Sequence, residues 1–205
     1  MIITVGRQHG SNGHDIARLL AEELNMKCYD KEIVDEAAAN SQFSKEIFDS
    51  YDEKRVSAYV IPTPHYVGMN EGFRLNMQVA AAQFDAMRNL ADKGNCIFVG
   101  RCADYVLGEC ANVLNVVSVF IRADLEKRVR RAMRVYSLEE GEARRLIQKT
   151  DKIRAKYYTA HTQRDWGAIG NYTLIVDTGK LGTDGAAALI ETAVKALNER
   201  ETQEL

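Results

Sequence analysis

Residues 2–24 read IITVGRQHGSNGHDIARLLAEEL. Residues 2–5 are a β-branched run typical of a short strand, and Gly6 begins a loop that contains further glycines. Apolar residues then return at helical spacing, at Ile16, Ala17, Leu20 and Leu24. A strand, a glycine loop and a helix in this order suit a phosphate, because glycines let amides point inward and the helix N-terminus adds partial positive charge. A glycine-rich turn that binds nothing is the alternative these residues leave open.

Beyond this stretch, apolar runs predict four more strands, at Met26–Tyr29, Cys96–Val99, Val116–Ile121 and Thr173–Val176. Five strands that alternate with helices predict an α/β fold with a mostly parallel sheet and right-handed crossovers. In such folds ligands bind beyond the carboxyl ends of the strands. The two prolines, Pro62 and Pro64, lie in VIPTPHYVG (60–68) and predict a surface loop there.

Helical patterns fill the intervals between the strands. They predict helices over 31–40, from Ser44, over about 71–93, and from about 139 into the Tyr157-Tyr158 region. Another helix is marked by Leu125, Val129, Ala132 and Met133, of which Leu125, Val129 and Met133 are expected to point toward the sheet. We expect Thr183 to cap a last helix whose sheet-facing residues are Ala186, Leu189, Ile190, Ala193 and Leu197.

The composition favours one cytoplasmic domain. The chain has 205 residues, 46% of them hydrophobic, and a formal net charge of −2, which argues against a general nucleic-acid or membrane-surface binder. Residues 1–8 carry no basic leader, and no run of eighteen apolar residues occurs. The four cysteines form no CxxC pair and are expected to be reduced thiols, namely Cys28, Cys96, Cys102 and Cys110.

The glycine loop departs from the GxxxxGK[ST] phosphate-binding pattern. His14 stands where the lysine belongs, and no Ser or Thr follows it to hold magnesium. A histidine carries little charge at pH 7, so we expect the missing charge to come from Arg7. Loss of a direct cation contact costs on the order of 2–4 kcal/mol, or roughly a hundredfold in rate, unless another group replaces it.

Six blocks, in this order, resemble the cytidylate kinase-like family of nucleoside monophosphate kinases: GRQHGSNGHDIARLLAEEL, CYDKEIVDEAA, FVGRCADYVL, FIRADLEKRVRRAM, TDKIRAKYY and IVDTGKLG. The resemblance implies a P-loop NTPase-like three-layer fold with a five-stranded sheet and a helical lid. It also implies one domain over 1–205. Its core would span about 1–42, 72–135 and 172–200, with a variable acceptor-side insert at about 43–71 and the lid at about 136–171.

The resemblance further implies small-molecule nucleotide substrates, with ATP and Mg²⁺ as cofactors. The nucleotide phosphates would lie on the loop, against Arg7, Gly10, Ser11, Asn12, Gly13, His14 and Asp15. The acceptor monophosphate would meet Arg101, with Asp30 and Asp104 orienting substrate or, through water, magnesium. The lid would bring Arg128, Arg131 and Arg154 to the transferred group, with Asp151 orienting Arg154. The magnesium ligands and the oligomeric state are left open.

Simpler interpretations stand beside these roles. Arg101 can pair with a surface carboxylate, Asp30 can cap the helix that starts at Lys31, and Asp151 and Arg154 can form a plain helix salt bridge. Arg128 and Arg131 can belong to a solvated, arginine-rich helix face that includes Arg130 and Arg134. Four aromatic residues suggest a base-stacking platform but are more often packing, namely Tyr157, Tyr158, His161 and Trp166.

Three functions remain open on these grounds. The leading hypothesis is an ATP-dependent kinase of a nucleoside monophosphate, with CMP or dCMP as the expected acceptor. The second is a nucleotide-binding protein that kept the phosphate cradle and lost turnover, which the missing lysine favours. The third is a kinase of another small phosphate acceptor, since the segment around Pro62 to Gly72 can shape a different pocket.

Overall fold

Five parallel strands form the sheet of the described chain: β1 (Ile2–Arg7), β2 (Lys27–Tyr29), β3 (Cys96–Val99), β4 (Val116–Arg122) and β5 (Leu174–Asp177). Their order is β2-β3-β1-β4-β5, and every pair is parallel. The computed structural model describes residues 1–51, 71–110 and 115–204, so the loop predicted at 60–68 lies outside them. The prediction of a mostly parallel five-stranded α/β sheet is confirmed, although the last strand lies one residue later than expected.

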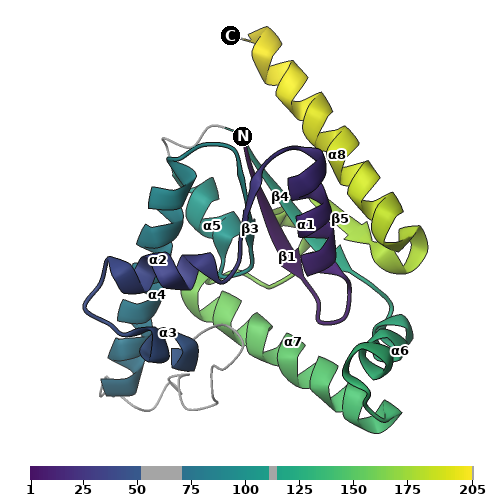
Figure 1. Ribbon diagram of the computed structural model, residues 1–205, viewed down its shortest axis with the longest axis horizontal. Helices are drawn as coiled ribbons and strands as arrows, with labels where there is room; N and C mark the ends of the chain where they lie inside the picture. Colours follow the sequence, from purple (N-terminus) through teal and green to yellow (C-terminus); the bar gives the residue numbers. More distant parts are fainter. Residues whose placement is uncertain (52–70, 111–114, 205) are drawn as a thin grey trace.

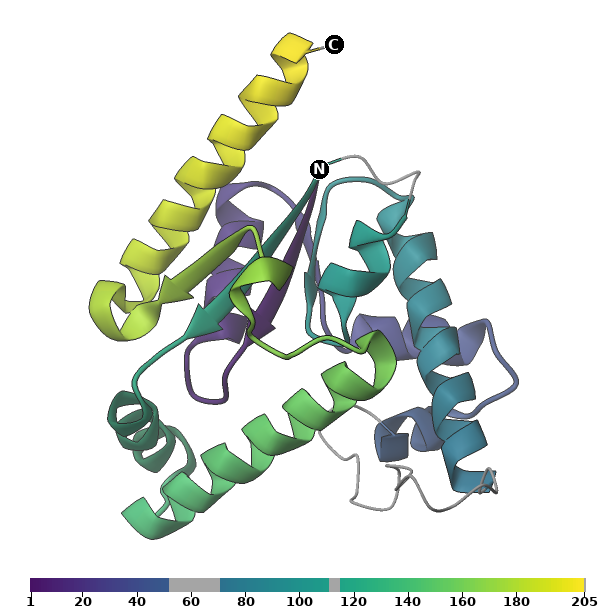
Figure 2. The same ribbon diagram turned by 180° about the vertical axis from the view of Figure 1, so that it is seen from behind.

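Helices cover both faces of the sheet (Figure 1). One face is covered by α1 (Gly13–Glu23) and α8 (Thr178–Glu204), which bury Ile3, Val5 and their neighbours. The other face is covered by α5 (Ala103–Gly108), with α4 (Glu71–Ala91), α2 (Glu32–Ala39) and α3 (Lys45–Tyr51) packed beside it. Figure 2 shows that the segment 163–173, with a 3₁₀ turn at Ile169–Asn171, also runs over this second face.

Two further helices lie at the carboxyl end of the sheet, where α7 (Glu140–Thr162) crosses below the strands in Figure 1 and α6 (Leu125–Tyr136) precedes it. The apolar side of α6 packs on α7 in a separate cluster, in which Val129 and Ala132 meet Ala143 and Ile147. The expectation that this side of α6 faces the sheet is therefore wrong, because α7 provides the apolar partner. The chain that leaves β1 continues to β2 on one side of the sheet, whereas the chain that leaves β4 continues to β5 on the other side. Because these connections run in opposite directions, a crevice opens between the carboxyl ends of the neighbouring strands β1 and β4.

Two helical predictions need correction. The six-residue helix α5 was not predicted, since it begins directly after a strand and a tight turn. Helix α8 is broken at Gly182, where φ is 72° and ψ is −179°. Beyond the break, Ala186 and Ile190 are buried as predicted. Leu189 was also expected to face the sheet but is 48% exposed, and Ala187 and Val194 are buried instead. The predicted face was therefore rotated by about one residue.

The cysteines are free thiols, as expected. Burial raises the pKa of both Cys28 and Cys96 to about 11, so these two thiols stay protonated near neutral pH. Within the described ranges, no helix has both the length and the apolar character that crossing a membrane requires.

Candidate functional site

The glycine loop joins β1 to α1 by an abrupt turn at the crevice. Gly10 has φ +79°, and a Cβ there would lie 3.1 Å from the carbonyl oxygen of Arg128. Asn12 also has positive φ, 64°, directly before the first residue of α1. A Cβ on Gly13 would come within 2.5 Å of the Cβ of Arg7. Close approach of the loop to its own strand therefore requires glycine at position 13, and backbone conformation favours it at position 10.

The loop is seated on the end of β4. The amide of Gln8 donates to the carbonyl of Ile121 at 3.0 Å, and its side-chain Oε1 accepts from the amide of Ala123 at 3.1 Å. The buried hydroxyl of Ser11 lies 2.8 Å from the carbonyl of Gln8 and 3.1 Å from that of Ile121. Ser11 thus braces the loop from behind, and its side chain is turned away from the open side.

The open side carries unused backbone donors. Within the described chain, five residues of the loop and of the first turn of α1 have amides with no hydrogen-bond acceptor: Gly10, Asn12, Gly13, His14 and Asp15. All five residues line one cavity of about 380 Å³. Unpaired amides at a helix N-terminus attract anions, so the loop has the donors of a phosphate cradle.

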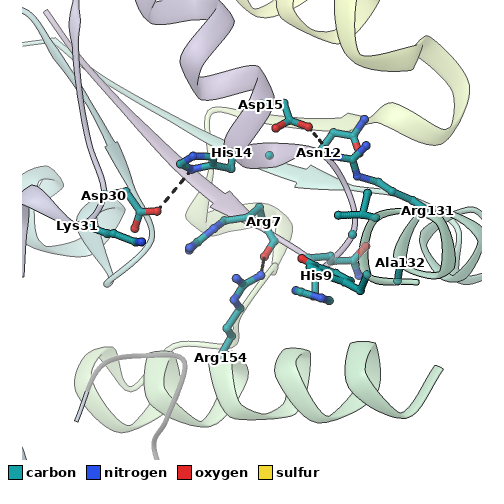
Figure 3. Close-up of a pocket in the computed structure, with 15 residues that line it drawn as sticks. Arg7, His9, Asn12, His14, Asp15, Asp30, Lys31, Arg131, Ala132 and Arg154 are labelled. Carbon is teal, nitrogen blue, oxygen red and sulfur yellow. Dashed lines mark hydrogen bonds and ion pairs between the residues drawn. The ribbon is translucent and has the colours of Figure 1, made fainter. Parts of the chain in front are cut away.

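Cationic side chains converge on the same cavity (Figure 3). Its other lining residues are Arg7, Gln8, His9, Asp30, Lys31, Arg131, Ala132, Val135, Tyr136 and Arg154. Arg154 reaches up from α7 and donates to the carbonyl of Arg7 at 3.0 Å. Arg131 reaches across from α6 and pairs with Asp15 on α1. The cavity is thus built from four parts of the chain, namely the loop with the start of α1, the residues after β2, α6 and α7, and it gathers nine of the residues that the sequence singled out.

Arg128 does not line this cavity and instead binds the loop from behind. Its Nε donates to the carbonyl of Ala123 at 2.9 Å, and its Nη1 lies 3.2 Å from the carbonyl of His9 and 2.5 Å from Oδ2 of Asp151. Asp151 also accepts the amide of His9 at 2.7 Å. The expected pairing of Asp151 with Arg154 is therefore wrong, because the carboxylate is held by Arg128 and the loop.

His9 sits among these arginines as a neutral side chain. Its ring stacks on Tyr136 with 5.8 Å between centroids and 10° between planes. Burial, followed by the charges of Arg154 and Arg128, lowers the pKa of His9 to about 4. Its Nε2 is buried and has no hydrogen-bond partner within the described residues. The positive character of the cavity thus comes from the arginines and Lys31, with no contribution from His9.

Arg101 takes a different place from the one expected. Its side chain is 1% exposed and lies outside the glycine-loop cavity, beside Tyr158 and Trp166 in a very small internal pocket. Its Nη1 donates to Oδ1 of Asp30 at 2.7 Å, while Oδ2 of Asp30 lies 3.5 Å from Nδ1 of His14. The surface ion pair considered for Arg101 is thus a buried one. The helix-capping role of Asp30 is not seen either, since Lys31 is the N-cap residue of α2.

The backbone at this arginine is strained. Gly100, Arg101 and Cys102 are three consecutive residues with positive φ, of 78°, 53° and 58°. The left-handed region is unfavourable for residues with a Cβ, and such conformations persist where the surroundings impose them. The turn directs the guanidinium inward to Asp30, which does line the cavity.

Asp104 lies beside this internal pocket and binds the C-terminal half of α7. Its Oδ2 accepts from the hydroxyl of Tyr158 at 2.6 Å. Burial raises the pKa of Asp104 despite this hydrogen bond. The proposed base-stacking aromatics are packing groups: Trp166 meets Phe120 edge-on, and Tyr157 and Tyr158 are 3% exposed.

The family model of the cytidylate kinase-like family matches residues 2–180. The chain belongs to the cytidylate kinase-like family. It is similar to the cytidylate kinases of Methanopyrus kandleri (27% identity over 98% of this chain and 96% of that protein) and Methanothrix thermoacetophila (26%, over 96% and 99%). An uncharacterized protein from Eubacterium ventriosum has a similar structure, with TM-score 0.72, 27% identity and coverage of 95% and 98%. Shikimate kinase from Bacteroides thetaiotaomicron has the same fold, with TM-score 0.51, 15% identity and coverage of 100% and 99%.

Family membership implies Mg²⁺, and the cavity offers it few protein ligands. No group of three or more His, Cys, Asp or Glu side chains suited to a metal occurs in the described chain. Two carboxylates line the cavity, and each already faces an arginine: Asp15 faces Arg131, and Asp30 faces Arg101. Mg²⁺ commonly keeps several waters and needs only one or two carboxylates besides substrate phosphates. These residues therefore fit a magnesium ion that arrives with a nucleotide and is held largely by its phosphates.

Several cavity residues of this family member were missed from the sequence. Gln8 and His9 lie inside the loop that was analysed, and Lys31 directly follows Asp30, so proximity to a site residue was an available signal. Ala132, Val135 and Tyr136 come from the far half of α6. Nothing in the local sequence of α6 indicates that its last turn folds back over His9.

Proposed function

We propose that this protein is an ATP-dependent kinase of a nucleoside monophosphate, with CMP or dCMP as the acceptor. The observation that carries the proposal is the convergence of five unpaired amides with Arg7, Arg131 and Arg154 on one cavity at the crevice of a parallel sheet. Phosphoryl transfer depends mainly on positioning and on charge neutralisation, which is what this arrangement offers. The family and the names of the two cytidylate kinases that resemble this chain support the same reaction class.

In the proposed reaction the chain's own groups bind and orient the phosphates. The amides from Gly10 to Asp15 hold the donor phosphates, and Arg131 and Arg154 face the phosphoryl group as it moves. Mg²⁺, when bound with the nucleotide, supplies further charge neutralisation. Helix α7 and the end of α6 line the cavity together with the loop, and in the proposed reaction they shield the bound phosphates from water, which limits hydrolysis of ATP.

We propose that Asp30 orients the acceptor nucleotide by direct contact, and that Arg101 acts indirectly by positioning the Asp30 carboxylate. Asp30 lines the cavity, whereas Arg101 is buried behind it and fixes one carboxylate oxygen at 2.7 Å. Asp104 acts at a greater distance, by holding Tyr158 and with it the C-terminal half of α7. This assignment replaces direct capture of the acceptor phosphate by Arg101.

A non-catalytic nucleotide-binding protein is the second candidate. The observation that favours it is the loop itself, which presents amides but no lysine to the cavity, while its arginine neighbour Arg131 is already occupied by Asp15. Such a protein would bind ATP and release no ADP.

A coupled ADP-release assay separates the two candidates. Purified protein is given ATP and Mg²⁺ with CMP, dCMP, UMP or AMP, and nucleotide binding is measured in parallel. Arg131→Met should lower kcat by roughly a hundredfold, as expected for a lost cation at the transferring phosphoryl group. The control is Arg130→Met, which removes an exposed arginine on the same helix and should leave turnover unchanged. Binding of ATP without ADP release from any acceptor would refute the kinase and favour the second candidate.

A further inference from the structure

Lys31 stands at the carboxyl end of β2 and lines the glycine-loop cavity. It is the N-cap residue of α2, with φ −77° and ψ −29°, so its backbone is fixed by the start of that helix. The neighbouring Asp30 is held by the buried Arg101, which anchors the base of the lysine stem. In the described chain no carboxylate lies within ion-pair distance of the Lys31 ammonium.

Two other cations around the cavity have partners within the chain. Arg131 pairs with Asp15, and Arg154 donates to the carbonyl of Arg7. Figure 3 shows the side chains of Lys31 and Arg7 extending toward each other across the open space below His14. An anion placed in this space would lie within reach of both cationic side chains.

We propose that Lys31 supplies the ammonium that the glycine loop lacks and binds the terminal phosphates of the nucleotide from the β2 side. The inference rests on the proposed function, because it assumes that the cavity takes a polyphosphate. A lysine has a flexible four-carbon stem and three donors, so it can follow a phosphoryl group as a mobile point charge. In the GxxxxGK[ST] pattern the lysine stands at the start of the helix that follows the loop. In this chain the corresponding charge would come from the end of β2, another strand of the same sheet.

The test uses phosphate binding, which does not depend on turnover. Isothermal titration with inorganic tripolyphosphate and with ATP is applied to the wild type, Lys31→Met and Lys31→Arg. The matched control is Lys27→Met, which removes an exposed lysine of β2, four residues before Lys31, that does not line the cavity. Because it loses one charge-assisted contact, Lys31→Met should bind tripolyphosphate and ATP about tenfold to a hundredfold more weakly than the wild type does. Lys31→Arg should retain most of the affinity, and Lys27→Met should bind as the wild type does. Circular dichroism checks that every variant is folded.

The outcomes separate this inference from the proposed function. If Lys31→Met binds both ligands as tightly as the wild type, or if Lys27→Met loses as much affinity, the inference is overturned whether or not the protein is a kinase. If the wild type binds neither tripolyphosphate nor ATP, the inference and the proposed function both fail. If Lys31→Met alone loses affinity but no acceptor is phosphorylated by the wild type, the lysine site stands and the kinase assignment falls.

Discussion

Replacement of Asp151 by asparagine tests how firmly α7 is bound to the glycine loop. Asparagine keeps the size of the side chain and an oxygen that can still accept the His9 amide, now 2.7 Å from Oδ1. It removes the negative charge that lies 2.5 Å from Nη1 of Arg128. The guanidinium stays in place through its bonds to the carbonyls of Ala123 and His9, and it is left there without a counter-charge.

The expected cost follows from burial. The side chains of Arg128 and Asp151 are 8% and 17% exposed, and removal of one partner from a buried pair costs about 3–5 kcal/mol. Because the amide acceptor and the two carbonyl contacts survive, we expect less, about 2–3 kcal/mol of unfolding free energy. In a domain of this size each kcal/mol shifts the melting temperature by about 2–4 °C, so the midpoint should fall by about 4–12 °C.

Thermal unfolding followed by circular dichroism measures this shift. The control is Glu140→Gln, which breaks an exposed pair with Arg144 on the same helix and should leave the midpoint unchanged. The double variant Arg128→Met with Asp151→Asn should recover part of the loss, because it leaves no unpaired buried charge and keeps an acceptor for the His9 amide. A midpoint for Asp151→Asn equal to that of the Glu140→Gln control would refute the reasoning.

Three other changes have defined outcomes. Gly13→Ala forces its new Cβ against Arg7, 2.5 Å from the Cβ there, and should cost about 1–3 kcal/mol in urea unfolding together with weaker ATP binding; wild-type stability would contradict the packing argument. Burial raises the pKa of Asp104, so the folded state holds that proton more tightly than the unfolded chain and loses stability as pH rises above 3.8. Asp104→Asn keeps an acceptor for the Tyr158 hydroxyl. Its urea unfolding midpoint should depend less on pH above 3.8 than that of the wild type, and it should be no lower than the wild-type midpoint at pH 7. The pKa of His9 is lowered to about 4, so its contribution to stability is complete above pH 6.5 and lost as pH falls toward 4. His9→Phe should flatten that part of the melting profile, and a profile with the wild-type slope would count against it.

The strands were predictable because each is a short apolar run between polar or glycine-rich boundaries. Cys96–Val99 is buried at every position and was bounded correctly from the sequence. The glycine loop was predictable for a similar reason, since only a tight turn uses glycines at such spacing between a strand and a helix. Its position at the crevice followed from the parallel order of the sheet.

The side-chain partners were less predictable because they are set by tertiary contacts. Asp151 and Arg154 have the spacing of a helical pair, yet Asp151 pairs with Arg128, which belongs to another helix. The Gly-Arg motif at Arg101 places an arginine at a strand end, but the direction of its side chain depends on two left-handed residues. No local pattern indicates whether such a guanidinium turns toward solvent or into the core.

The turn at Gly100–Cys102 sets backbone strain against the side-chain contacts that it makes possible. Arg101 and Cys102 hold left-handed backbone angles that cost roughly 1 kcal/mol each for residues with a Cβ, and glycine would relieve that strain. At position 102 glycine would also remove the Cys102 side chain, which is 4% exposed and packed in the core, so relief of strain and loss of packing oppose each other there. At position 101 the same replacement would release Asp30 and, with it, the base of Lys31. Selection for turnover should keep the arginine there and accept the strained backbone.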